Sequence, residues 1–217
     1  MKLMGIDEAG RGSIVGPLVM AGFMVEESEQ PKLKELGVKD SKELTPKARE
    51  ELYKKLVRIG DYAVIIIKPL EIDNRSNEGI NLNRLELLKA VKLIKTLNPD
   101  KVIIDSPSPN EKKYKDELGT EINDERVKTV CENKADVNYP VVSAASIIAK
   151  VTRDREINKI ERELGEEIGT GYPHDDRSLA FVRKAINQGK GITHVRKSWE
   201  TFSRLKAESE QKRLSDF

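Results

Sequence analysis

The chain alternates between short apolar runs and longer segments whose apolar residues recur every three or four positions. Five short runs have the aliphatic, β-branched composition of buried strands, at residues 2–7, 17–25, 62–68, 101–105 and 126–131. The glycine-rich stretch GRGSIVG separates the first two runs, which are expected to be neighbouring strands. Three strands close together, followed by strands separated by helices, predict a mixed sheet covered by helices.

Three of the intervening segments have recognisable helix starts. Thr45 followed by Pro46 fits an N-cap and a first helical position, and Asn81 precedes a segment with leucines at helical spacing. The third and longest helix is predicted over residues 140–164, where Pro140 opens it.

The long helix carries two kinds of residue on neighbouring faces. An apolar stripe is expected from Val141, Ala144, Ala145, Ile148 and Val151. The polar residues Ser143, Ser146, Lys150 and Arg153 fall together beside it. Hydroxyls and amides at a helix start, with a lysine and an arginine further along, could hold a nucleic-acid backbone. A merely solvated face is the alternative, and the spacing leaves both open.

Composition limits the classes of site that this fold could carry. The 217 residues suit one domain with a sizeable core, and the 35% of charged residues favours a thermophilic source. A net charge of +2 requires any nucleic-acid site to concentrate its positive charge locally. A single cysteine, Cys131, excludes an intramolecular disulfide and a thiolate zinc site, and it is expected to be a small buried residue. The two histidines have no serine or cysteine nucleophile motif beside them, which argues against a catalytic triad and a histidine-rich metal centre. No apolar run approaches the ~20 residues that cross a bilayer and no leader is evident, so a cytoplasmic protein without membrane contact is expected.

Four acidic residues stand where apolar runs begin or end. Asp7 and Glu8 follow the first run, Asp105 ends the fourth, and Asp136 precedes the long helix. Strands that end on carboxylates bring negative charges together at one edge of a sheet, which is unfavourable unless a divalent cation neutralises them. The pattern therefore predicts a metal site.

The glycine-rich loop after Glu8 is not a nucleotide-binding P-loop. In GIDEAGRG, Arg11 replaces the lysine of the Walker pattern and Gly12 replaces the hydroxyl residue that would hold magnesium. What remains is a sharp turn in which Gly10 and Gly12 allow a ligand to approach the backbone. By itself such a turn is compatible with a structural or a functional role.

A longer series of motifs gives the chain a family resemblance. DEAGRG is followed by DSK at 40–42, an aspartate ending the fourth strand, KAD before PVVSAASIIAKVTRD, then GTGYP and VRKSW. From Met1 to about Trp199 this series resembles ribonuclease HII, the type 2 ribonuclease H family, and its archaeal members most closely. The resemblance implies the ribonuclease H-like α/β fold, a five-stranded mixed sheet flanked by helices, as a catalytic domain over residues 1–190. A C-terminal helical extension and tail are expected over residues 191–217.

The resemblance also implies an activity and a metal requirement. The family's metal-binding catalytic acids match Asp7, Glu8, Asp105 and Asp136, which would hold two Mg²⁺ or Mn²⁺ ions, with Asp7 bridging them. Family enzymes cut on the 5′ side of a ribonucleotide, in RNA/DNA hybrids and in duplex DNA that contains single ribonucleotides. They leave 5′-phosphate and 3′-hydroxyl ends, which implies a role in DNA repair and replication.

Substrate contacts follow from the same resemblance. In family members the turn that matches Gly10, Arg11 and Gly12 contacts the ribose 2′-hydroxyl, and a tyrosine that matches Tyr172 packs on the adjoining sugar. The residues expected to grip the nucleic-acid backbone are Ser41, Lys42, Lys134, Ser143, Ser146 and Lys150. Arg196 and Lys197 are expected to add to this groove, whereas Trp199 is expected to pack against the core. One departure is visible, because Asn133 stands where the archaeal pattern commonly has histidine, and a proton-shuttling role there is in doubt.

The tail suggests a protein partner. Gln211, Leu214 and Phe217 form Q-x-x-L-x-x-F, which resembles the motif by which DNA-repair proteins bind a sliding clamp; the second aromatic of that motif is missing. The protein is expected to be a monomer. Two other functions remain alternatives: a different nuclease of the same fold group, which would not require the ribonucleotide, and a non-enzymatic clamp-bound adaptor, which would tolerate loss of the acids.

Overall fold

The computed structural model describes the backbone of residues 1–38 and 44–215 and the side chains of these ranges up to Gln211. Its strands are β1 (Lys2–Ala9), β2 (Leu18–Glu26), β3 (Asp61–Ile67), β4 (Lys101–Asp105) and β5 (Lys128–Glu132). Its α-helices are α1 (Gln30–Glu35), α2 (Pro46–Ile59), α3 (Pro69–Asn74), α4 (Leu82–Leu97), α5 (Glu111–Ile122), α6 (Ala135–Asn138), α7 (Pro140–Leu164), α8 (Asp176–Gln188) and α9 (Glu200–Ser215). Two 3₁₀ turns, η1 (Glu27–Glu29) and η2 (Ile192–His194), complete the described elements.

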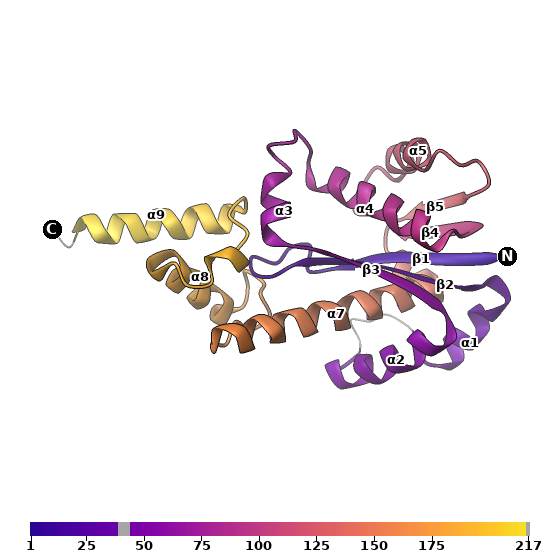
Figure 1. The fold of residues 1–217 in the computed structure, drawn as a ribbon, viewed down its shortest axis with the longest axis horizontal. Coiled ribbons are helices and arrows are strands. Elements are labelled where there is room, and N and C mark those ends of the chain that lie inside the picture. The colour runs from indigo at the N-terminus through magenta and orange to yellow at the C-terminus, as the bar shows by residue number, and fades with distance from the viewer. Residues whose placement is uncertain (39–43, 216–217) are drawn as a thin grey trace. The chain divides into compact units, whose positions relative to one another are not determined.

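The five strands form one mixed sheet in the order β3-β2-β1-β4-β5 (Figure 1). β1 is antiparallel to β2 and parallel to β4, and β4 is parallel to β5. The five predicted strands are thereby confirmed, with ends that move by one or two residues, and so is the mixed sheet. Because β1 and β4 run in the same direction, their carboxyl ends lie at the same edge of the sheet.

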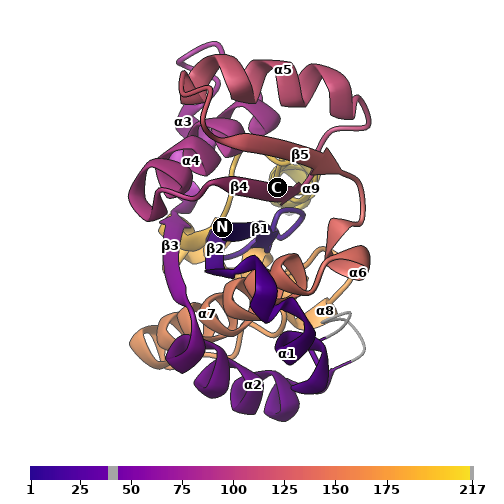
Figure 2. The same ribbon diagram turned by 90° about the vertical axis from the view of Figure 1, so that its right-hand side faces the viewer.

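Helices cover both faces of the sheet (Figures 1 and 2). α4 and α5 lie on one face, and α1, α2 and the first half of α7 lie on the other. Thr45 and Asn81 accept hydrogen bonds from the backbone N–H groups of Ala48 at 3.2 Å and Arg84 at 2.9 Å, which confirms both predicted N-caps. The predicted helix 140–164 is also confirmed.

The main core explains which side of β1 faces α7. Leu3 and Ala9 of β1 belong to one buried cluster with the predicted apolar stripe of α7. A side chain at Gly5 would collide with the backbone of Val141, so the strand and the helix can approach this closely only with glycine there. Since side chains alternate along a strand, Asp7 shares this face and Glu8 is directed toward the opposite one.

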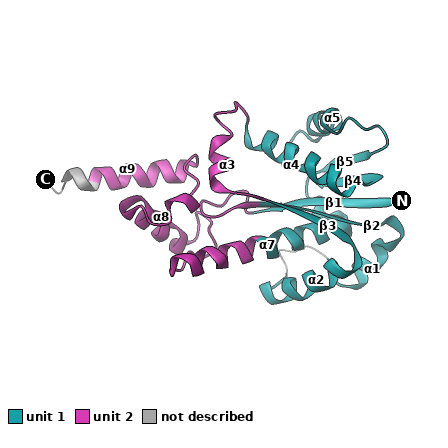
Figure 3. Ribbon diagram, in the orientation of Figure 1, with its two compact units in different colours: residues 1–9, 19–65, 81–152 teal, residues 10–18, 66–80, 153–217 magenta. Residues whose placement is uncertain are grey.

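The chain divides into two compact units (Figure 3). The first contains residues 1–9, 19–65 and 81–152, and the second contains residues 10–18, 66–80 and 153–217. The second has its own core, to which Ile14, Val15, Phe181, Val182 and Val195 contribute. The predicted division into a catalytic domain over residues 1–190 and a C-terminal extension over residues 191–217 stays a prediction. Among the described residues, no helix is long and apolar enough to cross a membrane.

Candidate active site

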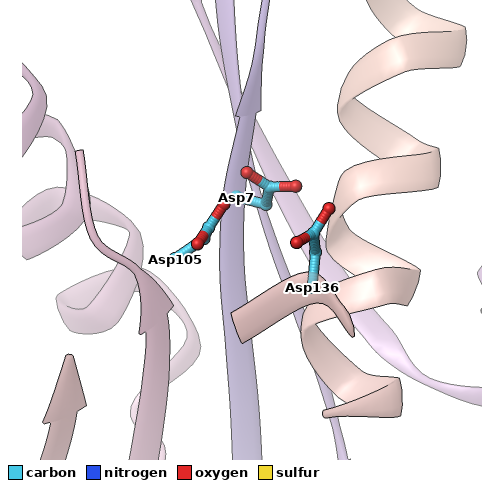
Figure 4. Close-up of side chains that lie close together, drawn as sticks. All are labelled: Asp7, Asp105 and Asp136. Carbon is cyan, nitrogen blue, oxygen red and sulfur yellow. The ribbon is translucent and has the colours of Figure 1, made fainter. Parts of the chain in front are cut away.

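Three aspartates from distant parts of the chain meet in the first unit (Figure 4). Asp7 lies on β1, Asp105 ends β4 and Asp136 lies on α6, and one carboxylate oxygen of each is within 4.8 Å of the others. The strand register accounts for the first pair, because Ile6 lies opposite Ile104 and the next residue on each strand is an aspartate. The sequence-predicted cluster of acids is therefore present for these three residues.

Burial makes this cluster electrostatically costly. Asp7 is 5% exposed and Asp136 is 1% exposed, whereas Asp105 is half-buried. Loss of hydration raises the pKa of Asp7 from its ordinary value of 3.8 to about 7; the nearby Asp105 also raises it, while a hydrogen bond from Ser146 and the charge of Lys150 lower it. Three clustered carboxylates with this cost are the environment that a hard divalent cation stabilises.

The donor set fits such a cation. Mg²⁺ and Mn²⁺ prefer oxygen ligands at short distances, and carboxylates are the protein groups that supply them. Oxygens that lie within 4.8 Å of one another can share one ion with small side-chain adjustments. Glu8 does not belong to this group, in keeping with its direction on β1.

Several hydrogen bonds hold the aspartates in place. The N–H of Glu8 donates to Asp7 Oδ1 at 2.7 Å, and the N–H of Ala135 donates to Asp105 Oδ1 at 3.0 Å, which ties α6 to the end of β4. Lys150 Nζ donates to Ser146 Oγ at 2.7 Å. The carboxylates are thus oriented from the sheet, from α6 and from α7.

Glu132, which sequence analysis did not single out, fixes the segment that carries Asp136. As the last residue of β5, it accepts hydrogen bonds from Asn138 Nδ2 at 2.5 Å and from the Tyr139 hydroxyl at 2.9 Å. The Ser143 hydroxyl donates to the backbone carbonyl of Asp136. The alternating side-chain pattern of β5 does not predict these contacts, because they depend on the turn that leads from β5 into α6.

In the second unit, the glycine-rich turn is fastened by a buried arginine. The guanidinium of Arg196 donates to the carbonyl oxygens of Gly10 at 2.7 Å, Arg11 at 2.8 Å and Gly16 at 3.1 Å. Arg196 is 0% exposed, so the expectation that it contacts nucleic acid in the groove is wrong. Its donors are directed at the protein's own backbone, leaving no accessible surface for a phosphate.

The fold requires glycine at one position of the turn but not at the other. Gly10 has φ +83°, and a Cβ there would lie 2.8 Å from the carbonyl oxygen of Pro17, so the fold requires glycine. Gly12 is exposed, its φ is outside the left-handed region, and a Cβ there would meet no described atom within 4 Å. The fold alone therefore gives no reason for glycine at position 12.

Tyr172 lies in a loop of the same unit, and its ring contacts two neighbouring side chains. The guanidinium carbon of Arg153 lies 4.9 Å from the centre of the Tyr172 ring, and the ring of His174 stacks on Tyr172 at 5.5 Å. Asp175 accepts the N–H of Thr170 at 2.7 Å, and backbone hydrogen bonds to the loop hold its pKa well below the usual range. The tyrosine is half-buried and held from several sides.

A protein-family comparison decides between the possible families. The model of the family described as Ribonuclease HII matches residues 4–202. The chain belongs to the ribonuclease HII family. A ribonuclease HII of Methanococcus maripaludis is 43% identical over 217 residues, which cover 98% of this chain and 90% of the relative.

Solved structures agree with this family assignment. The crystal structure of ribonuclease H2 from Pyrococcus horikoshii has a TM-score of 0.88 and 40% identity, covering 97% of this chain and 100% of that one. Ribonuclease HII in its complex with PCNA from Archaeoglobus fulgidus has a TM-score of 0.85 and 36% identity, covering 92% of this chain and 96% of that one. The expected ribonuclease H-like fold is confirmed, and the protein is a metal-dependent ribonuclease that acts on RNA/DNA.

The other predicted contact residues of this ribonuclease differ in accessibility. Lys134 is exposed and Lys150 is partly buried, whereas Ser143 and Ser146 are 2% and 0% exposed, so the solvated-face alternative is wrong for both serines.

Trp199 packs on the core of the second unit between Arg75 and Arg196, as expected. Ser41, Lys42 and Phe217 lie outside the described residues, as does the side chain of Leu214. Gln211 is exposed on α9.

The residue at the position of the family's histidine is part of the scaffold. The backbone N–H and the side-chain amide of Asn133 both donate to Glu111 Oε1, at 2.7 Å and 2.5 Å. These bonds tie the start of α5 to the segment that leads from β5 into α6. A side-chain amide does not exchange protons near neutral pH, so a shuttling role for Asn133 is not expected.

Proposed function

We propose that this ribonuclease cleaves the phosphodiester on the 5′ side of a ribonucleotide, in RNA/DNA hybrids and at ribonucleotides embedded in duplex DNA, and leaves 5′-phosphate and 3′-hydroxyl ends. The observation that carries the proposal is the cluster of Asp7, Asp105 and Asp136, with two of the three buried, in a member of this family. Removal of embedded ribonucleotides by a monomeric enzyme during DNA repair and replication would be its cellular role.

The metal set proposed for the site is a pair of Mg²⁺ or Mn²⁺ ions. Asp7 would bridge the two positions, with Asp105 and Glu8 at one and Asp136 at the other. When bound, such ions supply the Lewis acidity that activates a water and stabilises the leaving 3′ oxygen. Glu8 is directed away from α7, so its longer side chain would have to reach around the end of β4, which stops at Asp105.

The chain's own residues prepare the carboxylates for this task. Ser146 and Lys150 favour the ionised form of Asp7, and the N–H of Ala135 fixes one oxygen of Asp105. Ser143 and Ser146 are buried, so we propose that they orient the carboxylates and affect a bound phosphate only through them. Supporting bonds of this kind typically change metal affinity by 10–100-fold in other metalloproteins.

Recognition of the sugar is proposed for the second unit. The exposed backbone of Gly10, Arg11 and Gly12 would donate to the ribose 2′-oxygen, which distinguishes RNA from DNA. Glycine at position 12 supports this role, because the surrounding protein does not require it. The held ring of Tyr172 would pack against the neighbouring sugar.

Phosphate contacts are proposed for the lysines and for the DSK motif. Lys134 is exposed beside Asp136, and Ser41, Lys42 and Lys150 are the further candidates. Each phosphate that a lysine neutralises releases counterions, so the affinity for the duplex should fall as salt concentration rises.

The assay that tests the proposal uses a DNA duplex with one embedded ribonucleotide and Mg²⁺ or Mn²⁺. Cleavage on the 5′ side of the ribonucleotide, with an intact all-DNA duplex, is the expected result. Equal cleavage of the two duplexes would identify a nuclease without ribose recognition and would contradict the proposal. A product with a 3′-phosphate would contradict the proposed chemistry.

A sliding clamp is the proposed protein partner of the tail. Gln211, Leu214 and Phe217 match the Q-x-x-L-x-x-F pattern, and the backbone of α9 is helical through Ser215. A related ribonuclease HII from Archaeoglobus fulgidus forms a complex with PCNA, which supports the same partner class here. Deleting residues 210–217 should abolish heat release on mixing with the clamp in calorimetry, while cleavage of a short duplex stays unchanged. Unchanged clamp affinity would remove this partner.

A further inference from the structure

A fully buried arginine in the second unit joins the glycine-rich turn to the segment before α9. Arg196 lies 186 residues beyond Gly10, yet its Nη2 and Nη1 donate to the carbonyl oxygens of Gly10 and Arg11. Its Nε donates to Gly16 at the far end of the loop. A guanidinium has five N–H donors in a fixed plane, and a fully buried one bonded to three carbonyls holds them more rigidly than a single donor could.

These bonds determine where the turn's N–H groups point. The peptide bonds of the turn are trans, and in a trans peptide the N–H is directed opposite to the C=O of the preceding residue. The carbonyls of Gly10 and Arg11 face the buried guanidinium. The N–H groups of Arg11 and Gly12, which share these two peptide planes, must therefore face away from it, toward the exposed side of the turn at Gly12.

Further hydrogen bonds hold the rest of the turn in place. The Ser13 hydroxyl also donates to the Gly10 carbonyl, at 2.8 Å, and the N–H groups of Ile14 and Val15 donate to the Gly171 carbonyl at 2.8 Å and 3.1 Å. Arg196 is itself fixed by its backbone N–H, which donates to Ile14 at 2.9 Å. Its guanidinium carbon lies 5.0 Å from the centre of the Trp199 ring.

We infer that Arg196 is a positioning residue for ribose recognition: it turns two peptide planes so that the N–H groups of Arg11 and Gly12 are presented together to the 2′-oxygen of the substrate. This inference rests on the proposed role of the turn in reading the ribose. Arg196 touches neither substrate nor metal in this account. Its effect passes through the backbone of the turn.

The test measures discrimination at the 2′ position, which a general loss of stability does not change. Two duplexes are identical except for one nucleotide, a ribonucleotide in one and its 2′-deoxy-2′-fluoro counterpart in the other, because fluorine accepts hydrogen bonds poorly and donates none. The ratio of the two kcat/KM values is determined for the full-length enzyme with Mn²⁺. Arg196→Lys keeps the charge but loses the planar fork, so we expect the ratio to fall at least tenfold, through slower cleavage at the ribonucleotide.

The matched control is Val182→Ala, which removes buried volume from α8 in the core that also contains Ile14 and Val15, but removes none of the hydrogen bonds that hold the turn. It should lower both kcat/KM values by the same factor and leave their ratio unchanged. A wild-type ratio near one would overturn the proposed ribose recognition itself. If the wild-type enzyme discriminates and the folded Arg196→Lys enzyme has a kcat/KM ratio within twofold of the wild-type ratio, the role of Arg196 is overturned and the proposed ribose recognition stands.

A second variant and a measurement on the native residue keep the test decisive. Arg196→Gln retains a planar donor group, and we expect its ratio to lie between those of the wild type and Arg196→Lys. The measurement uses the Asp105→Asn protein, which keeps Arg196 and is not expected to turn over the substrate. The ribonucleotide duplex should shift the NMR signals of the Arg11 and Gly12 amides more than the 2′-fluoro duplex does. Equal shifts with both duplexes would contradict the inference, even if neither Arg196 variant folds.

Discussion

Replacing Asp7 with asparagine should make the metal-free protein more stable above neutral pH. The exchange conserves shape, and the amide oxygen can still accept the N–H of Glu8, which lies 2.7 Å from Oδ1. It removes the charge of a carboxyl that is 5% exposed and next to Asp105. A residue selected for cation binding is expected to cost stability when the cation is absent.

The magnitude follows from the pKa of Asp7. In the unfolded chain the carboxyl has a pKa near 3.8, and burial raises it to about 7 in the folded protein. At ~1.4 kcal/mol per pKa unit this difference corresponds to roughly 4 kcal/mol, and any water that enters the pocket reduces it, so a gain of about 2–4 kcal/mol is expected. Below about pH 3 the carboxyl is protonated in both states, and the two proteins should be equally stable with respect to this group.

Between these limits the sign of the pH dependence is fixed. The folded protein retains a proton that the unfolded chain releases, so the contribution of Asp7 to the free energy of unfolding falls as pH rises from about 4 and levels off above about 7. Asp7→Asn lacks this decrease. The difference between the two proteins should therefore grow from near zero at acid pH to its full value at pH 8.5.

The assay is urea unfolding followed by circular dichroism, in EDTA, at pH 5 and pH 8.5. Asp116→Asn, an exposed position on α5, is the control and should show no growing difference from the wild type. Adding Mn²⁺ should stabilise the wild type through binding to the folded state and should stabilise Asp7→Asn much less. A difference that does not increase with pH, or an Asp7→Asn protein that is less stable at pH 8.5, would refute the reasoning.

Three further predictions concern the same residues and the turn. Ser146→Ala removes the hydrogen bond that lowers the pKa of Asp7, so Mn²⁺ affinity measured by calorimetry at pH 7 should fall by about 10-fold or more, and less at pH 9; an affinity equal to the wild type at pH 7 would contradict this. Gly10→Ala should lower the free energy of unfolding by about 1–3 kcal/mol because of its positive φ, whereas Gly12→Ala should leave it within about 0.5 kcal/mol and reduce cleavage at ribonucleotides; equal effects on stability in urea would oppose this distinction. Asp105→Asn should abolish turnover while largely preserving duplex affinity in a gel-shift assay, and retained turnover would count against its role.

Most elements of the first unit could be predicted because local signals and tertiary contacts agree there. Asp105 ends a run of buried aliphatic residues, and the parallel pairing of β1 with β4 then brings it beside Asp7 without further information. The sequence gives little sign of α5, because charged residues fill most of its positions. Its buried side chains, Tyr114, Leu118 and Ile122, recur every four residues, a signal that was present but weak.

Contacts between distant segments could not be predicted from the same patterns. VRKSW contains two adjacent cations, and most arginines and lysines are exposed, so the sequence favours a place for Arg196 in the groove. Its burial depends on three carbonyls that a loop at the other end of the chain provides. Likewise, helical spacing grouped Ser143 with Ser146 but could not tell whether that face met solvent or the sheet.

Residues whose identity the fold does not explain are the most informative about ligands. Gly5 and Gly10 are needed because any side chain there would collide with backbone atoms, so they carry no evidence about function. Gly12 is different, since an alanine would fit in the protein, and Asp7 is different again, since burial raises its pKa and we expect a neutral side chain to be more stable in its place. The proposed function accounts for both identities, with a cation at Asp7 and a closely approaching polymer at Gly12. The stability measurements on Asp7→Asn and Gly12→Ala therefore test, without any assay of cleavage, whether these two positions were selected for binding.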